Sequence, residues 1–98
     1  MLKELIGYLD LPDSDYWYDH GCNVARSIID TSIDDFMKKL SNEWSAWPLM
    51  RQEHLAYILG ESNSASELSL INEMLKSVSP DDVVYRAKEA LDDYNQNT

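Results

Sequence analysis

Residues 64–91, SASELSLINEMLKSVSPDDVVYRAKEAL, predict two successive helices with a start signal for each. Residues 64–67 (SASE) form a capping box, in which a serine caps the helix and the glutamate bonds back to the cap. Apolar residues then recur at helical spacing as Leu68, Ile71, Leu75 and Val78. At residues 79–82 (SPDD) a cap precedes a proline and two acids, which the helix dipole favours in a first turn. This stretch therefore predicts a helical hairpin.

The same spacing of apolar residues extends to both sides of the hairpin. Apolar stripes predict helices over residues 2–9, 22–29, 33–40 and 48–59. A second capping box lies at residues 31–34, and Gly60 suits the position just after a helix end. The connections are short, which favours antiparallel neighbours. We therefore expect an all-α fold of five to six short helices in antiparallel hairpins, forming a single helical domain over residues 1–98.

The charge balance is strongly acidic. The chain has 18 Asp and Glu against 8 Lys and Arg, a formal net charge of −10. Binding to nucleic acid or to an anionic membrane needs clustered Lys and Arg, so neither is expected. An acidic chain steers basic partners toward itself.

Cys22 is the only cysteine, and neither a leader pattern nor a membrane-length apolar run is seen, so we expect a cytoplasmic protein.

Catalytic and metal-binding patterns are weak. His20 and Cys22 with Asp19 offer adjacent ligands, but a zinc site needs four, and His54 is the only other histidine. No orienting third group marks a nucleophile, and the three glycines are isolated, which excludes a phosphate-binding loop. We therefore expect no enzyme activity, no cofactor, no metal and no small-molecule substrate.

The segment from Asp10 to Asp19 is the most pointed candidate site. Its four acids surround three consecutive aromatics and have no evident duty as helix caps. Aromatic side chains give large contact areas, and acids complement a basic surface. The candidate partner-binding residues are Asp13, Asp15, Tyr16, Trp17, Tyr18 and Asp19. A second interpretation stays open, in which two of the aromatics anchor the segment to the core and the acids are simply solvated.

Other charged and aromatic residues favour structural roles. Arg51 and Arg86 fall near apolar helix faces, where a partly buried arginine needs a carboxylate partner, so both are expected to be struts between helices. Trp44 and Trp47 are expected to pack in the core. The acids Glu89, Asp92 and Asp93 form a solvated face, which becomes a second candidate patch if the partner is basic.

The second half resembles a HEAT-type helical repeat. Residues 47–60 are similar to the first helix of such a repeat, residues 67–78 to its second helix, and residues 82–91 to the next first helix. Arg51 and Arg86 lie 35 residues apart, a period typical of helical-hairpin solenoids. Two amphipathic helices that share a pattern would give the same spacing.

The chain as a whole resembles the small, acidic, helical immunity proteins of bacterial toxin systems, above all those of contact-dependent growth inhibition. The resemblance implies a cytoplasmic antitoxin that binds a cognate toxin domain, often a basic nuclease. The expected function is therefore toxin binding and nuclease inhibition, with the toxin's active site occluded. The alternative is a HEAT-like adaptor or regulatory subunit that binds a non-toxin protein.

Overall fold

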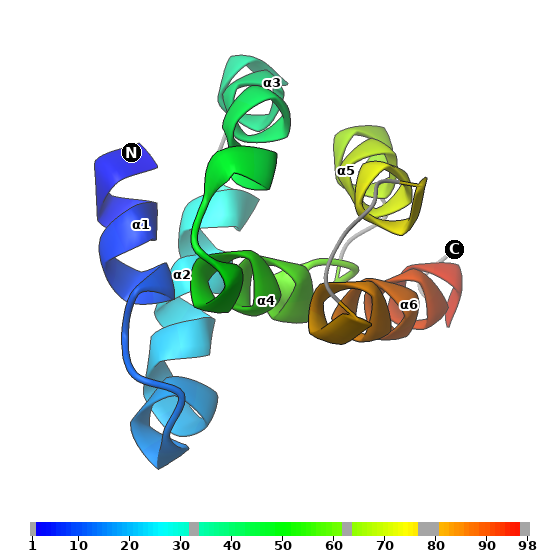
Figure 1. Ribbon diagram of the computed structural model, residues 1–98. Coiled ribbons are helices and arrows are strands. Elements are labelled where there is room, and N and C mark those ends of the chain that lie inside the picture. The colour runs from blue at the N-terminus through cyan, green and yellow to red at the C-terminus, as the bar shows by residue number, and fades with distance from the viewer. Residues whose placement is uncertain (1, 32–33, 62–63, 77–80, 97–98) are drawn as a thin grey trace.

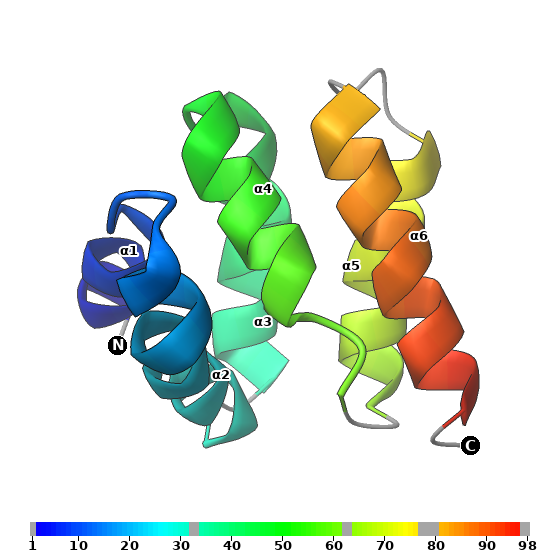
Figure 2. The ribbon, with the colours of Figure 1, turned by 90° about the horizontal axis from the view of Figure 1, so that it is seen from below.

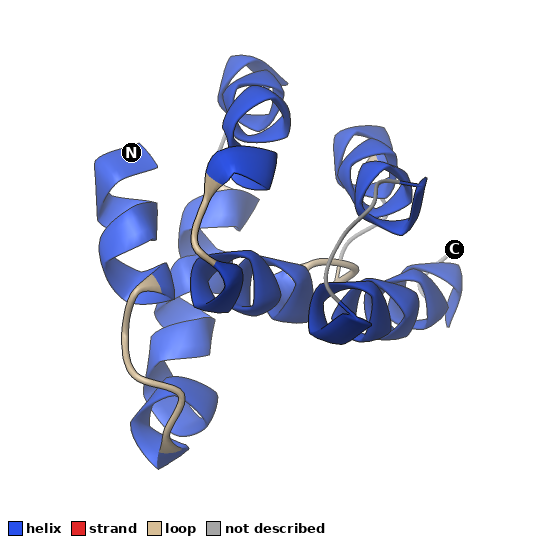
Figure 3. Cartoon of the chain, in the orientation of Figure 1, coloured by secondary structure: helices blue, strands red, loops and turns tan. Residues whose placement is uncertain are grey.

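The computed structural model describes residues 2–31, 34–61, 64–76 and 81–96, and the regular structure within these ranges is entirely helical (Figures 1 and 3). The elements are α1 (Leu2–Leu9), η1 (Trp17–Gly21), α2 (Cys22–Asp30), α3 (Asp34–Glu43), η2 (Trp44–Ala46), α4 (Leu49–Ile58), α5 (Ala65–Lys76) and α6 (Asp81–Gln96). The all-α prediction is confirmed. No helix in these ranges has both the length and the apolar character needed to cross a bilayer.

Packing between the helices only partly follows their order in the chain: α1 packs on α2 and α5 on α6, whereas α3 packs on α5 and α4 packs on α1, α2 and α6. Figure 2 shows α1 and α2 on one side, α3 and α4 in the middle, and α5 and α6 on the other side. Helix α6 is antiparallel to α5 and packs closely against both α4 and α5. The resemblance to a HEAT repeat implied instead that residues 47–60 and 67–78 pack as a pair. The described helices therefore give no confirmation of a HEAT-like repeat.

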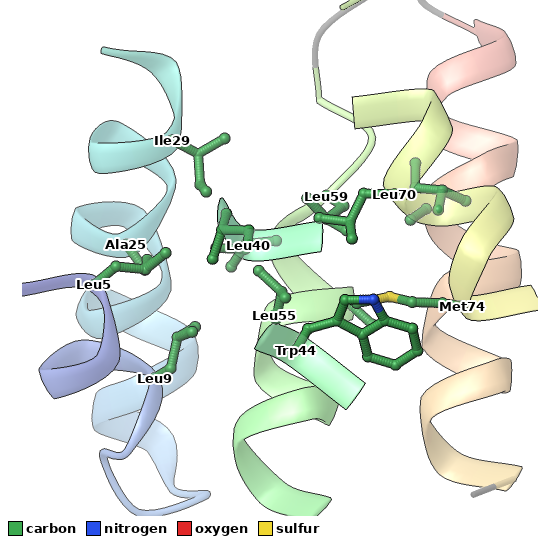
Figure 4. Close-up of a cluster of buried hydrophobic side chains, with 14 of the residues drawn as sticks. Leu5, Leu9, Ala25, Ile29, Leu40, Trp44, Leu55, Leu59, Leu70 and Met74 are labelled. Atoms are coloured by element: carbon green, nitrogen blue, oxygen red, sulfur yellow. The ribbon is translucent and has the colours of Figure 1, made fainter. Parts of the chain in front are cut away.

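The core runs as one connected cluster from α1 to α6. Leu40, Leu55 and Leu59 are fully buried, and Figure 4 shows their side chains pointing into a common interior. Trp44 is also buried, and its indole Nε1 donates a hydrogen bond of 3.1 Å to Glu73 of α5. The prediction of a core role is confirmed for Trp44, whereas Trp47 is only partly buried.

Gly60 ends α4 and also lets α6 approach. It has a φ of +91°, a conformation that favours glycine. A Cβ atom at this position would lie 2.1 Å from the carbonyl oxygen of Ala90. The predicted helix stop is confirmed, and close contact with the α6 backbone is a second reason for glycine.

Two predicted helix starts fall partly outside the described residues. The capping box at residues 31–34 includes residues 32–33, and the start at residues 79–82 includes residues 79–80. Val78 and Ile33, predicted to lie on apolar helix faces, are outside as well. Asp81 and Asp82 do lie in the first turn of α6, as expected.

Candidate functional site

In the segment from Asp10 to Asp19, the three aromatic residues lie at the beginning of a helix. The helix starts at Asp15 and continues to Asp30, with a π-helical turn over η1. The N–H of Cys22 donates to the carbonyl of Trp17, five residues earlier, which widens this turn. Gly21 lies inside it, where a Cβ would be 2.8 Å from Leu11 Cδ1 and 3.1 Å from Trp17 Cε3. The lack of a side chain at Gly21 therefore lets Leu11 and Trp17 pack against the turn.

Trp17 belongs to the core. Its side chain is 0% exposed, and its ring stacks on that of His54 in α4, with centroids 4.0 Å apart and an interplanar angle of 10°. A fully buried ring offers no surface to a partner. The prediction that Trp17 binds a partner is therefore wrong, and the residue instead anchors the segment to α4.

His54 joins α1 to the same anchor. Its Nδ1 lies 2.8 Å from the carbonyl oxygen of Leu9, and because a carbonyl only accepts, Nδ1 carries the proton. The other nitrogen, Nε2, is buried and has no hydrogen-bond partner among the described residues. Asp13 lies beside it, with 3.8 Å between its Oδ1 and Nε2.

Two of the acids in the segment have structural duties. The Tyr18 hydroxyl donates a 2.5 Å hydrogen bond to Asp13, which, together with burial, raises the pKa of Tyr18 to about 12. Asp10 accepts two hydrogen bonds from Arg51, at 2.8 and 2.9 Å. Asp10 and Asp13 therefore hold other side chains in place, a role that the sequence did not indicate. The predicted role of Arg51 as a strut is confirmed.

Three predicted residues remain free for contact with a partner. Asp15, Tyr16 and Asp19 are exposed, and Tyr16 is 55% exposed with its ring 5.3 Å from that of His20. We call these three residues the helix-start patch. Tyr18 is hydrogen-bonded to Asp13, and it lines a groove next to the patch.

The groove lies between the start of α2, the end of α4 and α6, and has a volume of about 290 Å³. Its lining consists of Tyr18, Cys22, Asn23, Tyr57, Ile58, Glu61, Arg86, Glu89, Ala90 and Asp93. The structure thus joins Tyr18 of the predicted segment to Glu89 and Asp93 of the second acidic face. Asn23 connects the groove to the helix-start patch, because its side chain donates to the carbonyl of Asp19 at 3.3 Å.

The charges and rings of the groove suit a cation. Three carboxylates and one guanidinium line it, so its net charge is negative. The rings of Tyr18 and Tyr57 meet edge to face, with centroids 5.2 Å apart and an interplanar angle of 80°. Burial raises the pKa of the Cys22 thiol, which favours the neutral form over a reactive thiolate. Cys22 therefore contributes a neutral thiol to the lining of the groove.

Arg86 forms one wall of the groove. Its guanidinium carbon lies 5.1 Å from the ring centroid of Tyr57 and 5.9 Å from that of Tyr85. It hydrogen-bonds to Glu89 at 3.2 Å and lies 3.8 Å from Glu53 of α4. The predicted role as a strut is confirmed, because the side chain bridges α6 and α4.

A buried ion pair supports the rim of the groove, and sequence reasoning missed it. Arg26 of α2 binds Glu67 of α5 through hydrogen bonds of 2.5 and 2.9 Å, and both side chains are buried. Arg26 also donates to the carbonyl of Ile58 at 2.9 Å, and Glu67 accepts from the N–H of Gly60 at 2.8 Å. The pair therefore fixes the chain just before Glu61. The only sequence signal was Glu67 itself, which the capping box already explained.

No three His, Cys, Asp or Glu side chains gather closely enough to hold a metal ion in the part of the chain that the structure describes. Comparisons with protein-family models, curated proteins and solved structures give no match to this chain. The functional argument therefore rests on the groove and the helix-start patch.

Proposed function

We propose that this chain is an immunity-type inhibitor that binds a basic protein domain through the groove and the helix-start patch. The observation that carries the proposal is the groove itself, where carboxylates from two segments surround tyrosine rings. Tyr16 of the helix-start patch is exposed and adds aromatic contact area, and aromatic residues supply much of the binding energy of protein interfaces. The resemblance to toxin–immunity systems names the partner class as a toxin, with a nuclease as the expected toxin.

Electrostatics supports a basic partner more than any other. A net charge of −10 attracts a cationic protein over long range and raises its association rate. Individual exposed ion pairs contribute only about 0–1 kcal/mol each, so charge supplies steering and selectivity. Burial of aromatic surface supplies the larger part of the affinity.

A nuclease fits this chemistry because its cleft must attract a polyanion. Lys and Arg that neutralise phosphates also attract a surface of carboxylates. An acidic face seated over such a cleft would exclude the substrate. Inhibition by occlusion needs no catalytic group in the inhibitor, in keeping with a groove that holds no activated nucleophile.

Co-expression with the product of the gene directly upstream tests the proposal. We expect that product to arrest growth when expressed alone, and this chain to restore growth and to co-purify with it. An upstream product that is harmless, or whose toxicity this chain leaves unchanged, would contradict the proposal. A stable complex without any effect on growth would favour the adaptor instead.

A further inference from the structure

We propose that the groove receives one arginine side chain of the partner, with its guanidinium against the tyrosine rings and between Glu61 and Asp93. This inference rests on the proposed function, because it names the chemical group by which the basic partner is anchored. The groove is lined by tyrosine rings, by the buried apolar residues Ile58 and Ala90, and by carboxylates from the chain after α4 and from α6.

The chain's own Arg86 shows which ligand chemistry this environment holds. Its guanidinium is stacked near Tyr57 and bound by Glu89. A second guanidinium beside it would meet the same kinds of group. Arg86 and an incoming arginine would compete for the same negative potential, so Arg86 limits the affinity of the groove for cations.

Carboxylates remain available on both sides of the groove. Asp93 has no ion-pair partner among the described residues, and it lies one turn after Glu89 on the same face of α6. Glu61 is 60% exposed, and its ion-pair partner among the described residues is Arg26 at 3.6 Å, whose charge Glu67 and Asp30 already balance. The two acids can therefore turn toward a new cation without breaking a buried pair.

Arginine suits the groove better than lysine. A guanidinium is planar, stacks on aromatic rings and donates to two carboxylates at once. An ammonium is a strongly hydrated point charge that gains less from a ring and loses more on leaving water. A groove with both tyrosines and carboxylates therefore favours arginine.

Peptide binding to the isolated chain tests this directly. The probes are three capped tripeptides, Gly-Arg-Gly, Gly-Lys-Gly and Gly-citrulline-Gly, titrated while amide chemical shifts are recorded by NMR. Citrulline has the shape of arginine without its charge. We expect the arginine peptide to bind most tightly and to shift the amides of Tyr57, Ala90 and Asp93.

Two pairs of variants distinguish the groove from general charge attraction. Asp93→Asn should weaken binding of the arginine peptide about five-fold, whereas Asp92→Asn, an equal charge change on the exposed neighbour, should leave it unchanged. Arg86→Gln should tighten binding two-fold or more because it removes the competing cation. Lys88→Gln, which removes the same charge from an exposed site outside the groove, should not.

The outcomes separate this inference from the proposed function. Equal binding of the arginine and citrulline peptides, equal effects of Asp93→Asn and Asp92→Asn, or shifts confined to other surfaces would overturn the arginine site. Capture of the toxin by a chain that fails these peptide tests would overturn only this inference. An arginine site in a chain that neutralises no toxin would overturn the proposed function and the assignment of the arginine to its partner.

Discussion

At the scale of single residues, neighbours that are distant in sequence decide each role. Trp17 is fully buried because His54 of α4 provides a ring to stack on, while Tyr16 beside it is exposed. Asp13 accepts a hydrogen bond from Tyr18, whereas the exposed Asp15 has no side-chain hydrogen bond or ion pair with another described residue. Adjacent residues of the same chemical type therefore divide between packing and potential contact with a partner.

Gly60 offers the sharpest test of the packing at this scale. Gly60→Ala should lower the free energy of unfolding by about 2–4 kcal/mol, because alanine is strained at positive φ and its Cβ meets the Ala90 carbonyl. Urea denaturation measures the change. Gly7→Ala is the matched control, since an added Cβ there meets nothing within 4 Å and alanine favours a helix, with an expected gain of about 0.5–1 kcal/mol. Equal effects of the two substitutions would contradict the close approach at Gly60.

The bond between Tyr18 and Asp13 predicts a specific pH dependence. The folded-state pKa of Tyr18, about 12, lies above its ordinary value of 10, so the protonated hydroxyl stabilises the fold. This contribution is complete below pH 10 and is lost as the pH rises through 12. Asp13→Ala should move the NMR titration of the Tyr18 ring down toward 10, whereas Asp15→Ala should not. Titration of wild-type Tyr18 near its ordinary value would contradict the bond.

At the scale of elements, the sequence predicts those features whose signals lie within a single helix. Helical spacing predicted all six helices from α1 to α6, and Gly60 marked the end of α4, because these signals depend on neighbours a few residues away. The π-helical turn of η1 was not predicted; Trp17 within it stacks on His54, which lies 37 positions later in the chain. The Arg26–Glu67 pair joins residues 41 positions apart, and the groove needs segments from α2, α4 and α6. The sequence alone indicated three of the groove residues, Tyr18, Glu89 and Asp93, but it did not indicate that they line the same groove.

The buried ion pair between Arg26 and Glu67 links α2 to α5. Burial opposes the charge of Arg26, but hydrogen bonds to Glu67 and Asp30 outweigh this and raise the pKa of the guanidinium. Glu67→Gln removes the buried partner and should cost about 3 kcal/mol in the free energy of unfolding. Asp30→Asn removes a partner that is 53% exposed and should cost less than about 1 kcal/mol. A chemical denaturation series gives both values, and a smaller loss for Glu67→Gln than for Asp30→Asn would contradict the assigned roles.

At the scale of the whole molecule, the acids that give the net charge of −10 differ in their structural roles. Some acids lie in the first turns of helices, where the dipole favours them, and others pair with Arg26, Arg51 or Arg86. Five exposed acids lie around the groove and in the helix-start patch, namely Asp15, Asp19, Glu61, Glu89 and Asp93. The arrangement places negative charge beside tyrosine, a combination that suits recognition of a basic protein.

Affinity for the purified product of the upstream gene, measured at two salt concentrations, tests the central claim most directly. Asp15→Lys with Asp19→Lys should weaken binding about ten-fold at low salt and flatten its salt dependence, since exposed charges steer association. The control, Glu4→Lys with Asp92→Lys, changes the net charge equally at exposed positions outside the groove and the patch and should have a smaller effect. Equal loss in both double variants, or no loss in the first, would contradict binding at this face.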